Sequence, residues 1–174
     1  MTYVLLTQLC LLMVSCLLKT AFWPWRRKAV LIIVYATIVF INSSLMGEVS
    51  GTSTDTLIHS RAVRLDWTIL VLLESLIIIV YCFAVNRWQR ILSYYPGLLA
   101  LATICYLQMQ VLITIPGISF TTFGWYSTTA TIVLLSLGSL LTRWGTHDRD
   151  TATELLFITQ LLIIILCILF TGII

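Results

Sequence analysis

One acidic residue, Glu74, lies near the middle of a long apolar segment, VLLESLIIIVYCF. A carboxylate at membrane depth is costly unless it is paired, protonated or hydrated, so such residues often mark proton or ion pathways. Desolvation favours the neutral acid, and a carboxyl group that titrates near neutral pH can relay protons. The sequence therefore predicts a proton-path role for Glu74. Two other roles stay open, which are a hydrogen bond that joins helices and a contact with substrate or lipid.

Three further polar side chains are candidates for the same proton path. Helical spacing places Tyr81 on the face of Glu74, two turns further along. Tyr106 and Gln110 are four residues apart in another apolar segment and therefore share one helix face. Their polar stripe could line a hydrated path or bond to Glu74. Hydrogen bonding between helices would explain the stripe equally well.

Six apolar segments must position these side chains, and each is long enough for a membrane-spanning helix. They cover residues 3–18, 29–46, 67–86, 96–115, 122–142 and 152–173. Short connections join them, except for a polar one at 47–66. Spanning segments without alternating polar residues are helices, because open sheet edges cannot face lipid. The predicted fold is therefore a single all-α integral membrane domain of six transmembrane helices with short loops.

Composition supports a membrane protein. Hydrophobic residues make up 60% and charged residues 10% of the 174 residues, whereas soluble domains carry about 25% charged residues. The mean hydropathy is +1.04. The net charge of +3 arises from basic residues between apolar segments. Because these basic residues do not form one basic face, we expect no nucleic-acid partner.

Basic residues predict how the helices are oriented. Eight of the ten lie in the first, third and fifth connections, namely Lys19, Arg26, Arg27, Lys28, Arg87, Arg90, Arg143 and Arg149. Positive connections face the cytoplasm or the matrix, so both termini are expected on the opposite, non-cytoplasmic side. No basic residue precedes the first apolar segment, so we expect no secretory signal peptide. The expected location is an energy-transducing inner membrane, either bacterial or mitochondrial.

The segment WPWRRK could contact anionic lipid headgroups. Its candidate residues are Trp23, Trp25, Arg26, Arg27 and Lys28. A simpler interpretation is that these charges only fix the topology. Elsewhere, small residues predict close helix packing at Gly138, Ser139 and Thr142. The motif Thr151-x-x-Glu154 predicts a capping box at the start of the last helix.

No cofactor or metal is expected. The five cysteines lack paired spacing, and no pair of histidines lies within the apolar segments to bind haem. No Gly-rich phosphate loop or pair of nucleophile and base is present in the sequence. The chain is therefore not expected to be catalytic alone, although it could be a subunit of a proton-pumping oxidoreductase.

The segment VLLESLII, residues 71–78, resembles the helix that carries a proton-path glutamate in the small K-type subunit of respiratory complex I and related membrane hydrogenases. That subunit has about three helices, whereas six apolar segments are present here. The resemblance implies a non-catalytic membrane subunit of a proton-translocating complex, with other membrane subunits and lipids as partners. The alternatives are a small oligomeric transporter or channel, or a scaffold or assembly subunit.

Overall fold

The computed structural model describes residues 2–46, 61–83, 92, 94–114 and 119–172. Within these ranges the regular secondary structure is helical, and no strand is present. The helices are α1 (Thr2–Thr20), α2 (Trp25–Met46), α4 (Arg61–Phe83), α6 (Leu98–Thr114), α7 (Phe120–Thr146) and α8 (Arg149–Gly172). The prediction of an all-α chain is confirmed for the residues described.

Among the described residues, four helices are long and apolar enough to cross a membrane, judged by length and composition. These stretches are Trp25–Leu45, Leu65–Phe83, Phe120–Thr146 and Arg149–Leu169, while Val4–Thr20 and Leu98–Leu112 are shorter apolar helices. Large apolar side chains stay exposed along the helices; Leu141, for example, is 66% exposed. An apolar surface of this extent suits lipid, which indicates a multi-pass membrane protein.

Several helix ends differ from the predicted ones. The helix α4 begins at Arg61, so residues 61–66 are helical and not part of a polar loop, while residues 47–60 lie outside the described chain. The predicted capping box at Thr151 and Glu154 is wrong, because α8 already begins at Arg149. The carbonyl of Asp148 accepts a bond of 3.2 Å from the amide of Ala152, which places Thr151 inside the first turn. Polar residues at helix ends thus extend the helices beyond their apolar segments.

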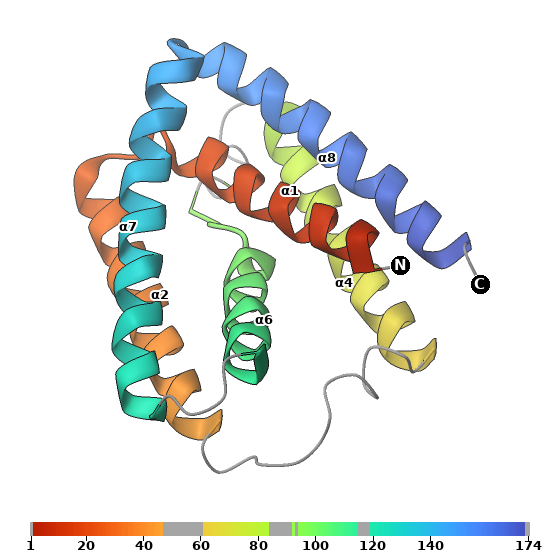
Figure 1. The fold of residues 1–174 in the computed structure, drawn as a ribbon. Coiled ribbons are helices and arrows are strands. Elements are labelled where there is room, and N and C mark those ends of the chain that lie inside the picture. Colours follow the sequence, from red (N-terminus) through yellow and green to blue (C-terminus); the bar gives the residue numbers. More distant parts are fainter. Residues whose placement is uncertain (1, 47–60, 84–91, 93, 115–118, 173–174) are drawn as a thin grey trace.

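The helices form two groups with α6 between them (Figure 1). One group is the pair α2 and α7, where the rings of Phe40 and Trp125 lie 5.3 Å apart. In the other group, α8 packs against both α1 and α4. Leu12, Val71, Leu99 and Ile163 form a buried cluster that joins α1, α4, α6 and α8. This core holds the start of α6 against α4.

Side-chain amides join α6 to α2 and α7, and join α8 to α1. Gln108 on α6 donates to the hydroxyl of Ser127 on α7 at 2.9 Å and accepts from Asn42 on α2 at 3.0 Å. Gln160 on α8 donates to the hydroxyl of Ser15 on α1. Such bonds link helices strongly in an apolar environment, because an unpaired amide there is costly.

The residues predicted for helix packing lie along α7. A side-chain carbon added at Gly138 would come within 2.9 Å of Leu17 on α1, so the two helices approach closely there. Ser139 is buried, and its hydroxyl donates to the carbonyl of Ser136 at 3.1 Å. The hydroxyl of Thr142 donates to the carbonyl of Gly138 at 2.6 Å. Of the three, Gly138 makes room for a neighbouring helix.

Candidate functional site

Glu74 is buried on α4 and binds the first turn of α6. Its Oε2 accepts hydrogen bonds from the amide of Leu99 at 2.9 Å and from the hydroxyl of Tyr95 at 3.1 Å. The first amides of a helix have no partner within that helix and carry a partial positive charge. Glu74 therefore acts as an N-terminal cap that a different helix supplies.

The turn before α6 is shaped so that Glu74 can approach the helix end. Gly97 has a φ of +100°, a backbone conformation that favours glycine. A side-chain carbon at this position would lie 3.1 Å from Oε1 of Glu74. The hydroxyl of Tyr35 on α2 donates to the carbonyl of Gly97 at 2.7 Å. The turn is therefore bonded to α2 through Tyr35 and to α4 through Glu74.

Lys19 lies close to this acid and is almost fully buried, with 4% of its surface exposed. Its ammonium group lies over the ring of Tyr81 at 4.7 Å and over the ring of Tyr95 at 5.1 Å. It has no hydrogen-bond partner among the described residues. It also interacts electrostatically with Glu74. A buried acid and a buried base are therefore coupled by charge, Tyr95 contacts both of them, and no hydrogen bond joins them directly in the described chain.

Tyr95 links the two charged groups. Its ring faces Lys19 and its hydroxyl donates to Glu74. Burial, followed by the nearby charge of Glu74, raises the pKa of Tyr95 to about 12. Tyr95 therefore keeps its proton at physiological pH and stays a hydrogen-bond donor to the acid.

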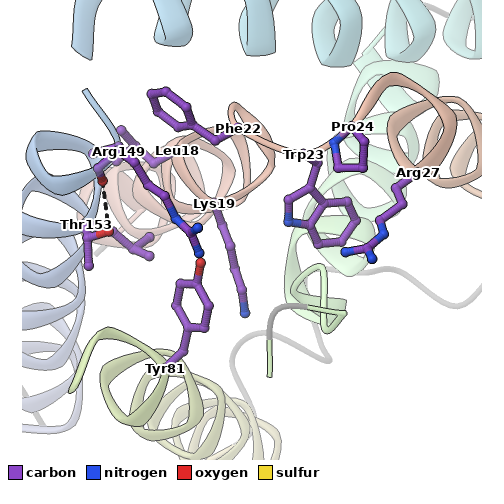
Figure 2. A pocket seen from close by; sticks show the side chains of 11 residues that line it. Leu18, Lys19, Phe22, Trp23, Pro24, Arg27, Tyr81, Arg149 and Thr153 are labelled. Atoms are coloured by element: carbon purple, nitrogen blue, oxygen red, sulfur yellow. Dashed lines mark hydrogen bonds between the residues drawn. The ribbon is translucent and has the colours of Figure 1, made fainter. Parts of the chain in front are cut away.

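A cavity of about 220 Å³ opens beside Lys19 (Figure 2). Its walls come from the end of α1, the turn into α2, the end of α4 and the start of α8. Lys19 and Tyr81 are buried, whereas Arg27 and Arg149 are exposed. The cavity therefore leads from an exposed basic rim toward the buried base, and Glu74 lies in electrostatic reach of that base.

The structure brings together only part of the predicted proton path. Lys19 connects two of the predicted residues. It interacts electrostatically with Glu74, and its ammonium lies over the ring of Tyr81. Gln110 donates to the hydroxyl of Tyr106 at 3.1 Å. Tyr106 lies seven residues beyond Leu99 on α6, which corresponds to roughly 10 Å along the helix axis. The predicted residues thus fall into two groups, and the Glu74 group is the one that contains charged side chains.

The headgroup candidates divide between the surface and the interior. Trp25 is 75% exposed, and Arg26 is exposed as well. Lys28 is turned inward, and its ammonium donates to the carbonyl of Ala21 at 2.7 Å. Arg27 donates to the hydroxyl of Tyr94 at 2.9 Å. Trp23 is half-buried, and its indole nitrogen has no hydrogen-bond partner among the described residues.

Three residues of the site were not singled out for this role by the sequence. Lys19 is a basic residue directly after the first apolar segment. A basic residue at that position is also what a topology signal alone would require. Tyr95 and Gly97 flank Pro96, and a Tyr-Pro-Gly turn next to a helix start could have indicated a special backbone. The inward direction of Lys19 depends on tertiary packing and carries no local signal.

In the part of the chain that the structure describes, no group of three or more His, Cys, Asp or Glu residues could hold a metal ion. No family model, no curated protein and no solved structure matches the chain. The function is therefore inferred from the chain's own residues.

Proposed function

We propose that the chain is a non-catalytic membrane subunit of a multisubunit, proton-translocating complex, in which Glu74 exchanges protons. The cluster of Glu74, Lys19 and Tyr95 carries this proposal. A buried acid and a buried base are kept close together at a cost in desolvation free energy. Groups of this kind concentrate at functional sites within membranes.

A route for protons supports the same role. The cavity reaches Lys19 from exposed Arg27 and Arg149, and a volume of about 220 Å³ holds several water molecules, since each occupies roughly 30 Å³ in the liquid. Tyr95 contacts both groups, because its ring lies 5.1 Å from the ammonium of Lys19 and its hydroxyl donates to Glu74 at 3.1 Å. We propose that protons enter from this basic end, which faces the cytoplasm or matrix in a six-span topology with both termini on the opposite side.

A scaffold role is the second candidate, and the capping bond favours it. Oε2 of Glu74 accepts from the amide of Leu99 at 2.9 Å, so the acid stabilises α6 whether or not it exchanges protons. In a pure scaffold, Glu74 would only join α4 to α6. A scaffold does not require a buried base beside this acid, and the presence of Lys19 there is why the proton role is preferred.

Purification of the tagged full-length protein from its native membrane in a mild detergent tests the proposal. We expect a large assembly that contains redox or quinone-binding subunits. In that assembly, Glu74→Gln should lower proton-coupled activity without loss of subunits. The matched control is Glu154→Gln, because Glu154 is exposed on α8 and should tolerate the same change.

The alternatives give different results. A homo-oligomer that moves an ion in liposomes would support an independent transporter or channel. Unchanged pumping by an assembly that carries Glu74→Gln would reject the proton role and leave the scaffold role.

A further inference from the structure

The cavity beside Lys19 contains hydrogen-bond donors without acceptors, and the charged side chains among its described lining residues are basic. It is lined by Leu18, Lys19, Phe22, Trp23, Pro24, Arg27, Tyr81, Arg149, Ala152, Thr153 and Leu156. Three of these residues are basic and none is acidic. The ammonium of Lys19 and the indole N–H of Trp23 are both buried without a hydrogen-bond partner in the described chain. Buried donors of this kind indicate a missing acceptor, because leaving them unpaired is costly.

The position of the donors suits an anion that enters from the rim. Figure 2 shows the side chain of Arg149 extending toward Tyr81, with Lys19 beside it and Trp23 on the other side. Lys19 is only 4% exposed, so an anion that reaches it is held away from bulk water. The cavity also lies at the start of α8, where the helix dipole adds a partial positive charge.

Acidic groups near the cavity do not occupy it. Glu74 is not among the described lining residues, and its Oε2 is already bound to Leu99 and Tyr95. Asp148 and Asp150 flank Arg149 in sequence and are exposed. Neither lines the cavity, so no acidic side chain among its described lining residues competes for the three basic ones, although Arg27 also donates to Tyr94.

A second, apolar cavity of about 460 Å³ shares Trp23 and Arg27 with the first. Its remaining walls are largely apolar and follow α2 and the start of α6, among them Val30, Val34 and Leu101. The side-by-side placement of a basic cavity and an apolar one matches an amphiphile with a negative head and a hydrocarbon tail.

We propose that the cavity of Lys19, Trp23, Arg27 and Arg149 binds a phosphate group, and that an anionic phospholipid supplies it. The phosphate oxygens accept from the ammonium of Lys19 and the indole N–H of Trp23, and Arg27 and Arg149 close the rim. An acyl chain occupies the apolar cavity along α2. This assignment shares Lys19 and its cavity with the proposed proton route but does not use Glu74, so lipid binding and proton exchange at Glu74 are measured separately.

Equilibrium binding to the delipidated full-length protein in neutral detergent tests the site. One arm titrates phosphatidylglycerol, a second titrates phosphatidylcholine, and a third titrates inorganic phosphate. We expect saturable binding of phosphatidylglycerol, at least tenfold tighter than that of phosphatidylcholine. Lys19→Met should weaken this binding about tenfold or more, because it removes a charge-assisted hydrogen bond.

Two further variants guard against misfolding of the Lys19 variant. Arg149→Gln changes an exposed rim residue and should weaken binding severalfold with the fold intact. Arg143→Gln is the control, because Arg143 is an exposed basic residue outside both cavities and should leave the affinity unchanged.

Equal affinity for the two lipids would overturn the proposal, as would full binding by both Lys19→Met and Arg149→Gln. Binding of inorganic phosphate alone, lost in Lys19→Met, would support the anion site and overturn the lipid assignment. Equal losses of lipid affinity in Arg143→Gln and Arg149→Gln would mean that the net charge of the protein controls binding. That result would overturn a specific site.

Discussion

The capping bond of Glu74 predicts that two substitutions at this position have different effects on stability. Glu74→Ala removes the acceptor for the amide of Leu99 and for the hydroxyl of Tyr95. Leu99 is 8% exposed, so its amide would be left largely without water. An orphaned buried amide costs about 1–3 kcal/mol, and the loss of the second hydrogen bond costs about 1 kcal/mol. We therefore expect Glu74→Ala to lower the free energy of unfolding by about 2–4 kcal/mol.

Glu74→Gln keeps one carbonyl oxygen that can accept from the same amide. We expect it to lower the free energy of unfolding by no more than about 1 kcal/mol, because both hydrogen bonds can form again. The two variants should therefore differ by about 2 kcal/mol, which is roughly a thirtyfold difference in the unfolding equilibrium constant.

Equilibrium unfolding of the full-length protein in mixed micelles, followed by circular dichroism, measures this difference. Glu154→Ala is the control, since Glu154 is exposed on α8 and should change stability little. Equal stability of Glu74→Ala and Glu74→Gln would refute a bonded carboxyl group at the start of α6.

The same site makes three further predictions. Gly97→Ala should destabilise the protein by about 1–2 kcal/mol, because an alanine at a φ of +100° is strained and would crowd Glu74; Gly145→Ala, which meets open space, should not destabilise it in the same unfolding assay. Tyr35→Phe removes the bond to the carbonyl of Gly97 and should cost about 1 kcal/mol, and an unchanged unfolding midpoint would contradict this bond. Lys19→Met should destabilise the delipidated protein by about 3 kcal/mol, because it removes the buried charge beside Glu74 and two cation–π contacts, and an unchanged or higher thermal midpoint would contradict this role.

The sequence predicted the helical elements well, because apolar length is a strong local signal. It placed Glu74 in the interior for the same reason, and the structure buries this side chain. The helix ends were less predictable, since Arg61 and Arg149 continue their helices into polar sequence. The length of an apolar segment predicts which residues can contact lipid, whereas capping and turn geometry determine the residue at which a helix ends. Predictions for Arg87 and Arg90 lie outside the described residues.

The partners of Glu74 could not be predicted from local patterns. A stripe of side chains on α6 suggested a side-chain partner, whereas Glu74 binds the amide of Leu99 and the hydroxyl of Tyr95. The direction of Lys19 depends on how α1, α4 and the turn before α6 meet. Such long-range contacts follow from the packing of several helices, and the spacing within one segment does not encode them.

Infrared difference spectroscopy of the full-length protein in liposomes tests proton exchange at Glu74 most directly. We expect a carboxyl band that changes with pH, disappears in Glu74→Gln and persists in Glu154→Gln. Exchange of that carboxyl proton with heavy water should slow in Lys19→Met, because the route passes Lys19. A band for Glu74 that stays constant over the whole pH range in which the protein is folded would contradict proton exchange and leave this acid as a cap of α6.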